Sequence, residues 1–178
     1  MRGFDPTAFT PPLRVPELVC PPLVLRPYAT SDLAMVRQAS ADPQIPPISS
    51  VPRRYTDDAG RAFIARADEP ESGIGSIGLW LQEIESGRAS IGYWLVADAR
   101  GHGLAADALR AVVSFAFATL SIPRLHLFVE PWNVASAGTA EAAGFAREAT
   151  LRGWERIDGE QHDADCFALL HSEWVRPD

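Results

Sequence analysis

Residues 91–108 read IGYWLVADARGHGLAADA, and this stretch decides the fold. Its first residues form an apolar run that is typical of a strand. Its last residues begin a stripe of apolar side chains at helical spacing, which continues to Leu120. Between them stands RGHGLA, residues 100–105, whose two glycines permit backbone turns that other residues resist. The N–H groups that open a helix have no partner within it, and with the helix dipole they predict an anion site suited to phosphate.

The rest of the chain predicts one mixed α/β domain around this stretch. Runs 76–84 and 89–96 are separated by four residues and predict an antiparallel hairpin, and Asp158-Gly159 predicts a second tight turn. Residues 1–22 hold six prolines and are expected to form an N-terminal arm ahead of a domain over 23–178. The further expected strands are 23–27, 125–129, 151–157 and 165–170, and the expected helices are 30–41, 56–67, 104–120 and 136–143.

Composition excludes several classes of protein. The chain has 178 residues, of which 47% are hydrophobic and 22% charged, which rules out disorder of the whole chain. Its longest apolar run, 111–120, is far shorter than the roughly 20 residues of a membrane span, and no apolar signal core opens the chain. The two cysteines, Cys20 and Cys166, lie far apart and are expected to be reduced thiols of a cytoplasmic protein, with an isolated disulfide as the alternative.

The charged residues narrow the choice further. The net charge of −7 argues against nucleic acid as the main partner. All sixteen basic residues are arginine, so Schiff-base chemistry on a lysine and a P-loop lysine are excluded. An N-terminal arm is compatible with a homodimer, and nothing in the composition indicates a metal or a membrane partner.

A dinucleotide-binding fingerprint is the alternative interpretation of the glycines, since residues 101–106 also fit G-x-G-x-x-A and Glu130 follows at a distance that suits a ribose contact. Four residues separate the strand from the first glycine, whereas a Rossmann glycine follows its strand almost directly. An antiparallel hairpin precedes the glycines, and too little chain follows for further βαβ units. We therefore expect the anion site to bind a phosphate-containing ligand other than a nicotinamide dinucleotide, and a nicotinamide-dependent oxidoreductase is the less favoured alternative.

The segment 91–108 resembles the acyl-coenzyme A binding segment of the GNAT superfamily of N-acetyltransferases, in particular its RimJ/RimL-like branch. Arg100, Gly103 and Ala105 meet the pattern R/Q-x-x-G-x-G/A. Further matches follow in the same order over residues 23–175: PWNVAS at 131–136, AGF at 143–145, Leu151-Arg152, Asp158-Gly159 with His162-Asp163, and Glu173-Trp174. The resemblance implies the GNAT fold, a central and mostly antiparallel twisted sheet that is splayed at the acyl-CoA site and flanked by helices. The short segment 68–74 implies a sheet one strand short.

The resemblance also implies a co-substrate, acetyl-CoA, with no metal, and the residues that hold it. The pyrophosphate is expected on the backbone of Arg100, Gly101, His102, Gly103, Leu104 and Ala105. The pantetheine arm is expected along Leu95 and Val96, with one of their N–H groups stabilising the oxyanion. Asn133 is expected to contact the pantetheine or a water, and Ser136 to protonate or hydrogen-bond the departing thiolate. Helix capping is the alternative role for both. His102 stands where the family often has Arg or Lys, so Arg100, Arg110 or Arg124 are the candidates to supply positive charge.

The implied reaction is direct attack of an amine on the thioester, which requires an amine that has lost a proton. Ser90 stands where the family often has a glutamate. The candidate bases are therefore Glu83 and Glu130, and Glu85 and His126 are further candidates. An α-amine has a pKa of about 8 and is partly neutral at pH 7, so a dedicated base is not required. The expected acceptor is a protein N-terminal α-amine or a small-molecule amine. The alternative is a catalytically impaired acyl-CoA-binding or scaffold protein.

Overall fold

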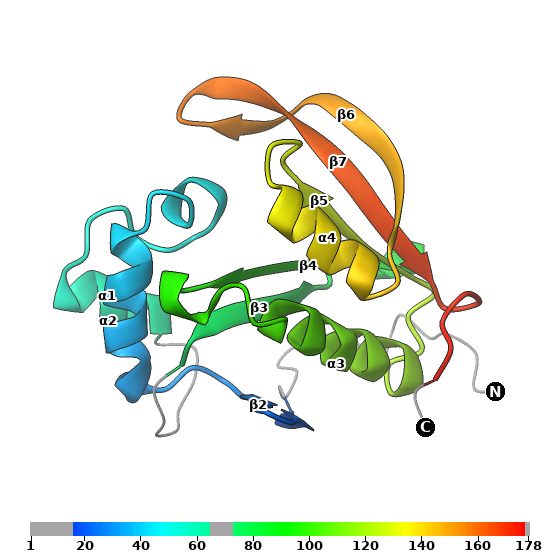
Figure 1. Cartoon of the computed structure of the whole chain (residues 1–178), viewed down its shortest axis with the longest axis horizontal. Coiled ribbons are helices and arrows are strands. Elements are labelled where there is room, and N and C mark those ends of the chain that lie inside the picture. The colour runs from blue at the N-terminus through cyan, green and yellow to red at the C-terminus, as the bar shows by residue number, and fades with distance from the viewer. Residues whose placement is uncertain (1–15, 65–72, 177–178) are drawn as a thin grey trace. The chain divides into compact units, whose positions relative to one another are not determined.

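The structure is a computed structural model that describes residues 16–64 and 73–176 (Figure 1). Five strands form one mixed sheet in the order β3-β4-β5-β7-β6, and β1 and β2 form a separate antiparallel pair. This arrangement confirms the predicted mixed α/β class. The strands are β1 Leu18–Cys20, β2 Leu23–Leu25, β3 Gly75–Trp80, β4 Arg88–Leu95, β5 Arg124–Val129, β6 Ala146–Ile157 and β7 Glu160–Leu170, and the α-helices are α1 Leu33–Ala41, α2 Asp57–Ile64, α3 Leu104–Ala118 and α4 Val134–Ala142.

The chain divides into two compact units. The N-terminal unit comprises, among the described residues, 16–64, 73–76 and 93–104. The C-terminal unit comprises the described residues 77–92 and 105–176. Strands β3 and β4 and helix α3 begin in one unit and end in the other.

The N-terminal unit is built around α1 and α2. Met35 and Val36 of α1 pack with Ile64 of α2, and with Val96 and Ala99 from the end of β4 and the turn after it. Thr56 Oγ1 accepts a hydrogen bond from the Ala59 N–H at 3.0 Å, which caps α2 as its sequence predicts. The predicted end of this helix at residue 67 and most of the predicted loop 68–74 lie outside the described residues, so the expected missing strand stays a prediction.

Part of the expected N-terminal arm is a strand. Leu18–Cys20 pair with Leu23–Leu25 across Pro21 and Pro22, in the register Val19↔Val24. The two prolines sit in the turn, where their missing N–H groups are not needed for pairing. Residues 1–15 lie outside the described residues, and the predicted domain boundary at residue 23 remains a prediction. Cys20 of this pair and Cys166 of β7 are not joined in a disulfide.

The C-terminal unit places β5 at the middle of the sheet. Leu125, Leu127 and Val129 are buried, and so are the alternate residues Phe167 and Leu169 of the antiparallel strand β7. Helix α3 buries Leu109, Val112, Val113, Ala116 and Phe117. Arg110 of α3 donates a hydrogen bond to the Ala142 carbonyl at the end of α4, and the two helices lie on the same side of the strands (Figure 1).

Strands β4 and β5 run parallel but pair only briefly. Their register joins Arg88 to Arg124, Ala89 to Leu125 and Ser90 to His126. Beyond this point β5 stays in register with β7 as far as Val129. The register between β4 and β5 therefore stops within the C-terminal unit, as the predicted splaying of these strands requires.

Candidate active site

The end of β4 directs its backbone groups to two different edges. The Val96 N–H donates to the Ile74 carbonyl at 3.0 Å. Because successive residues of a strand direct their N–H and C=O groups to opposite edges, the Leu95 N–H and C=O point away from Ile74. The Leu95 carbonyl accepts a hydrogen bond from Arg100 Nε at 3.0 Å. Of the two predicted oxyanion donors, Val96 is thus engaged inside the protein, and Leu95 directs its N–H to the other edge.

The segment 100–105, here called the glycine loop, follows a short 3-10 turn over Ala97–Ala99. Gly101 and Gly103 have φ angles of +81° and +78°, which side chains of L-residues rarely permit. A Cβ built on either glycine meets no atom within 4 Å. The glycines are therefore required by the backbone conformation rather than by close packing, and open space lies beside them. Helix α3 begins at Leu104, so its first N–H groups adjoin this open space.

The arginines expected to supply charge at a phosphate are already paired with carboxylates. Arg100 Nη2 lies 2.7 Å from Asp42 Oδ2, and Arg110 Nη1 lies 2.6 Å from Asp107 Oδ1. Arg124 binds both carboxylate oxygens of Glu148. Each of the three arginines therefore has a carboxylate partner, and the expectation that one of them supplies charge at a phosphate stays a prediction. His102 is exposed on the glycine loop.

Asn133 caps helix α4. Its Oδ1 accepts a hydrogen bond from the Ser136 N–H at 3.1 Å, so the capping role that the sequence left open is present. This contact uses the Ser136 backbone and leaves its hydroxyl to other interactions. Both side chains are half-buried at the start of the helix.

Glu83 lies in an ionic cluster on the connection between β3 and β4. Its Oε1 accepts a hydrogen bond from Arg88 Nη2 at 2.8 Å, and this contact lowers the pKa of the Glu83 carboxyl. A lowered pKa makes the carboxylate a poorer proton acceptor. His126 Nε2 lies 3.4 Å from Glu83 Oε2, while burial lowers the pKa of the His126 imidazole. The His126 Nδ1 is buried without a hydrogen-bond partner among the residues the structure describes.

Glu130 follows β5 and is only 6% exposed. Its charge acts on Glu155 of β6, whose pKa is raised first by burial and then by the repulsion from Glu130. His162 of β7, in register with Glu155, acts in the opposite direction.

Glu155 was missed by the sequence reasoning. Counting outward from the Asp158-Gly159 turn pairs Ile157 with Glu160 and then Glu155 with His162, so the sequence held the signal for that pair. No local feature of the sequence predicted that the Glu155 carboxyl is partly buried near Glu130. A carboxylate with a raised pKa is better poised to accept a proton near neutral pH than one with an ordinary pKa.

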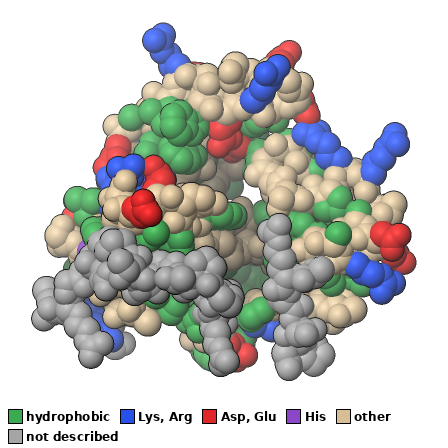
Figure 2. Space-filling model, turned by 180° about the vertical axis from the view of Figure 1, so that it is seen from behind, with side chains coloured by type: hydrophobic (Ala, Val, Ile, Leu, Met, Phe, Trp, Pro, Cys, Tyr) green, Lys and Arg blue, Asp and Glu red, His purple; other side chains and the backbone are tan. Residues whose placement is uncertain are grey.

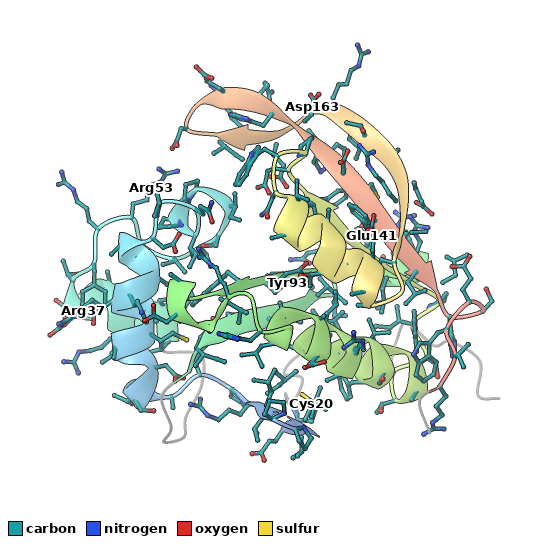
Figure 3. The ribbon with its side chains drawn as sticks, in the orientation of Figure 1. Cys20, Arg37, Arg53, Tyr93, Glu141 and Asp163 are labelled. Atoms are coloured by element: carbon teal, nitrogen blue, oxygen red, sulfur yellow. The ribbon has the colours of Figure 1, made fainter. Side chains whose placement is uncertain are left out.

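A bulge in β6 precedes Glu155. The register with β7 passes from Leu151↔Ala164 to Glu155↔His162, so β6 advances four residues while β7 advances two. Gly153 lies in this bulge with a φ of +59°, and its N–H donates to Asp163 Oδ1 at 2.8 Å. Asp163 is labelled on the β6–β7 hairpin in Figure 3. The Asp163 carboxylate therefore stabilises the bulge that precedes Glu155 in β6.

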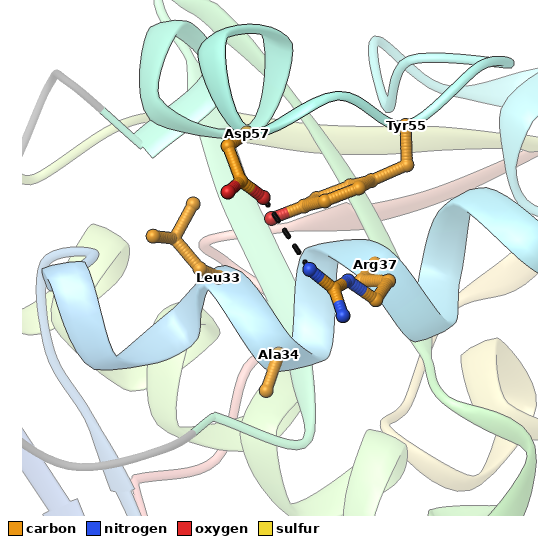
Figure 4. A pocket seen from close by; sticks show the side chains of 5 residues that line it. All are labelled: Leu33, Ala34, Arg37, Tyr55 and Asp57. Carbon is orange, nitrogen blue, oxygen red and sulfur yellow. Dashed lines mark hydrogen bonds and ion pairs between the residues drawn. The ribbon is translucent and has the colours of Figure 1, made fainter.

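A surface pocket of about 340 Å³ lies in the N-terminal unit and contains none of the predicted site residues (Figure 4). Arg37 of α1 lies over the Tyr55 ring, 4.9 Å from its centroid, and 3.3 Å from Asp57 Oδ1. The two charged side chains are mostly exposed and neutralise each other. The other lining residues are Leu33 and Ala34.

The surface shows no concentration of one charge on the face in Figure 2. Arginine side chains stand apart from one another there, with acidic and hydrophobic side chains between them. Within residues 16–64 and 73–176, no three His, Cys, Asp or Glu side chains are grouped as metal ligands would be. No helix in these ranges has both the length and the apolar character needed to cross a membrane.

The comparison that decides the family covers most of the chain. The model of the acetyltransferase (GNAT) domain family matches residues 22–146. This chain belongs to the GNAT acetyltransferase family. The predicted family is confirmed, and the match includes β2, the glycine loop and the whole of α4.

GNAT relatives are found among both sequences and solved structures. The uncharacterized N-acetyltransferase p20 of Bacillus licheniformis is 33% identical over 75 residues, which are 42% of each chain. This chain spans only about two-fifths of the length of the curated relatives it matches. A GNAT-family acetyltransferase from Bacillus anthracis shares the fold with a TM-score of 0.76 at 19% identity, over 89% of this chain and all of that one.

A structure from the RimJ/RimL-like branch also shares the GNAT fold. RimL, a ribosomal L7/L12 alpha-N-protein acetyltransferase solved in complex with coenzyme A, has a TM-score of 0.70 at 18% identity. The match covers 87% of this chain and 98% of that one. The branch named by the sequence motifs is thus represented among the structures of the same fold.

Proposed function

We propose that this protein is an N-acetyltransferase that transfers an acetyl group from acetyl-CoA to a primary amine by direct attack in a ternary complex. The observation that carries the proposal is the glycine loop. Two glycines with positive φ angles adjoin open space and lead into the first turn of α3, in a chain of the GNAT family. Such a turn presents several N–H groups to one anionic group.

The residues present suit acetyl-CoA. The space beside Gly101 and Gly103 can receive a pyrophosphate against backbone N–H groups, from Arg100 to Ala105. Binding there relies on backbone groups and the helix dipole, because the Arg100 side chain is paired with Asp42. The Leu95 N–H, on the edge of β4 opposite to Ile74, suits the pantetheine arm or the acyl oxygen. When bound, acetyl-CoA supplies the activated acetyl thioester.

The Leu95 N–H is proposed as the donor that stabilises the negative charge developing on the acyl oxygen. The substrate nitrogen forms the new C–N bond, and the C–S bond breaks. Ser136 is proposed to donate a hydrogen bond or its hydroxyl proton to the departing sulfur, and a hydroxyl that has given its proton regains one from solvent. Asn133 keeps the first turn of α4 in place through its cap on the Ser136 N–H, and it is also proposed to contact the coenzyme.

Glu155 is proposed to take the proton that the amine nitrogen must lose. Its raised pKa supports this role better than the lowered pKa of Glu83, which is bound to Arg88. Glu130, predicted as a base, is proposed to act beside it by raising the proton affinity of Glu155. The buried His126, with its lowered pKa, is assigned no part in the reaction.

The acceptor is proposed to be a primary amine, either a protein N-terminal α-amine or a small-molecule amine. The first option draws on RimL, whose name states an alpha-N-protein activity. We further propose that residues 23–178 form the catalytic domain after an N-terminal arm, that the protein acts in the cytoplasm without a metal, and that a homodimer is compatible with the arm.

The purified protein incubated with acetyl-CoA and a panel of primary amines tests this proposal. The panel holds peptides with free N-termini and small-molecule amines, and the assay follows thiol release together with the mass of the product. Release of thiol that depends on one of the amines is the expected result. Binding of acetyl-CoA without product from any amine would instead support the impaired, scaffold-type alternative.

A further inference from the structure

We infer that Asp42 is a positioning residue for the coenzyme site, which acts by holding the Arg100 side chain away from the phosphate and against the end of β4. The inference rests on the proposed function. Asp42 follows the last residue of α1, far in sequence from the glycine loop, and no motif singled it out.

The contact is specific on both sides. Arg100 Nη2 lies 2.7 Å from Asp42 Oδ2, Arg100 Nη1 lies 3.3 Å from Gln44 Oε1, and Arg100 Nε lies 3.0 Å from the Leu95 carbonyl. Three nitrogens of the guanidinium are thus engaged by three residues of the same unit. The Asp42 side chain is only 8% exposed, whereas that of Arg100 is 38% exposed. A charge-assisted contact with one partner this well buried fixes the geometry more firmly than a contact between two exposed side chains.

These contacts close the turn between β4 and the glycine loop. Within the turn, the Ala99 N–H donates to the Val96 carbonyl and the Arg100 N–H donates to the Ala97 carbonyl. The Arg100 side chain adds the link from the loop back to Leu95. Gly101 follows at once with its positive φ, so the orientation of Arg100 determines how the loop N–H groups are presented.

The hydrogen bond from Arg100 to the Leu95 carbonyl links Asp42 to the pantetheine side of the site as well. It lies on the edge of β4 that the proposed function assigns to the pantetheine arm. Arg100 Nε donates a hydrogen bond to the Leu95 carbonyl. The Leu95 N–H is then the backbone group of this residue that is proposed to contact the coenzyme. Asp42 therefore acts, through Arg100, on both the phosphate side and the pantetheine side of the coenzyme site.

Two roles for Arg100 predict opposite signs for the same substitution. If Arg100 binds the phosphate directly, Asp42→Asn weakens the ion pair of Arg100, makes its guanidinium available to the phosphate and tightens coenzyme binding. If Asp42 positions the loop through Arg100, the same substitution loosens the loop and weakens binding. Asp42→Asn keeps the size of the side chain and removes only its charge.

A neighbouring contact supplies a matched control. Gln38 Nε2 of α1 donates to Asp98 Oδ2 at 3.2 Å, which also links α1 to the turn after β4. Both side chains are exposed, and the hydrogen bonds of the Arg100 side chain go to Leu95, Gln44 and Asp42 instead. Asp98→Asn therefore removes a carboxylate charge from a second contact between α1 and the turn after β4, without changing the contact between Asp42 and Arg100.

The test measures the dissociation constant of coenzyme A by calorimetry, and KM for acetyl-CoA and kcat with an accepted amine. For Asp42→Asn we expect the dissociation constant and KM to rise about tenfold, with kcat within about twofold, while Asp98→Asn stays within about twofold in all three. In the Arg100→Gln background, Asp42→Asn is expected to have no further effect, because Asp42 acts through Arg100.

Unchanged or tighter coenzyme binding in Asp42→Asn would overturn the inference while leaving the proposed function standing. Failure of the unsubstituted protein to bind acetyl-CoA would overturn the proposed function itself. If Asp42→Asn does not fold, Arg100→Gln is measured alone: weaker coenzyme binding with faster amide hydrogen exchange over residues 95–104 supports the inference, and unchanged exchange contradicts it.

Discussion

Glu155 of β6 lies beside Glu130 at the end of β5, close enough for the charge of Glu130 to add to burial in raising the pKa of Glu155. The Glu130 side chain is itself buried, with only 6% of its surface exposed. A carboxyl whose pKa is raised in this way accepts a proton more readily near neutral pH than one with an ordinary pKa. This relationship supports the role of proton acceptor proposed for Glu155.

Glu155→Gln is expected to change the pH dependence of stability. A carboxyl with a raised pKa in the folded state takes up a proton more readily there than in the unfolded chain. The free energy of unfolding therefore falls as the pH rises from about 4.3, the ordinary pKa, through the raised folded value. Glutamine removes this loss, so the variant is expected to be more stable than the unsubstituted protein at pH 7 and equally stable below pH 4 (about the ordinary pKa). Urea unfolding at both pH values measures the difference, and a variant less stable at pH 7 would contradict it.

The same variant is expected to lose kcat by about a hundredfold at pH 7, which is the lower end of the range for general-base catalysis. The acidic limb of the pH–rate profile is expected to disappear with it. Glu83→Gln serves as the matched control, because Glu83 is bound to Arg88 and its pKa is lowered. An equal loss of kcat in the two variants would remove the distinction between the two carboxylates.

Ser136→Ala tests the hydroxyl without disturbing the helix cap, because Asn133 Oδ1 binds the backbone N–H of residue 136. We expect kcat to fall at least about tenfold, with the dissociation constant of coenzyme A unchanged, since the hydroxyl is proposed to act on the departing sulfur. Steady-state rates and calorimetry measure the two quantities. A kcat equal to that of the unsubstituted protein would exclude the proton-donor role of Ser136.

Gly103→Ala and Gly138→Ala form a matched pair. At neither position would a Cβ meet another atom within 4 Å, but Gly103 has a φ of +78° and Gly138 lies within helix α4. Gly103→Ala is expected to cost roughly 1–2 kcal/mol of stability and to weaken coenzyme binding. Gly138→Ala is expected to add roughly 0.5–1 kcal/mol and to leave binding unchanged. Thermal unfolding and calorimetry check both, and a stabilised Gly103→Ala would contradict the backbone argument.

His126→Gln is expected to flatten the stability profile near neutral pH. Burial lowers the pKa of His126, so the folded protein holds this imidazole neutral where the unfolded chain protonates it. The free energy of unfolding therefore falls as the pH drops from about 6.5 towards the lowered folded value. The charges that face this imidazole are those of Glu83, Arg124, Arg88 and Glu148. Urea unfolding between pH 5 and 7.5, spanning the ordinary pKa of about 6.5, should show a smaller slope in the variant; an equal slope would assign the titration elsewhere.

The elements with strong local signals could be predicted from the sequence. The apolar stripe after the glycine loop, the Thr56 cap and the Asp158-Gly159 turn each act within a few residues, and the structure has them where expected. The strand Leu18–Cys20 was missed, because six prolines hid a short alternation that needs its partner strand to be recognised.

The site was predictable only where the backbone defines it. Gly101 and Gly103 adopt the positive φ angles that their residue type suggests. Arg100 and Asp42 pair although they lie 58 positions apart in the sequence. Glu155 of β6 is half-buried and is affected by the charge of Glu130, which follows β5. No local pattern encodes such contacts, because they depend on how the strands and helices pack.

Calorimetric titration with acetyl-CoA tests the central claim most directly, with NADH as the control ligand and Gly103→Asp as the control variant. The account predicts a micromolar dissociation constant for acetyl-CoA, which corresponds to a binding free energy of about 8 kcal/mol, and no binding of NADH. It also predicts that Gly103→Asp does not bind acetyl-CoA, because the added carboxylate occupies the space beside the glycine loop and makes it negative. No heat of binding with acetyl-CoA, or equal binding to Gly103→Asp, would contradict it.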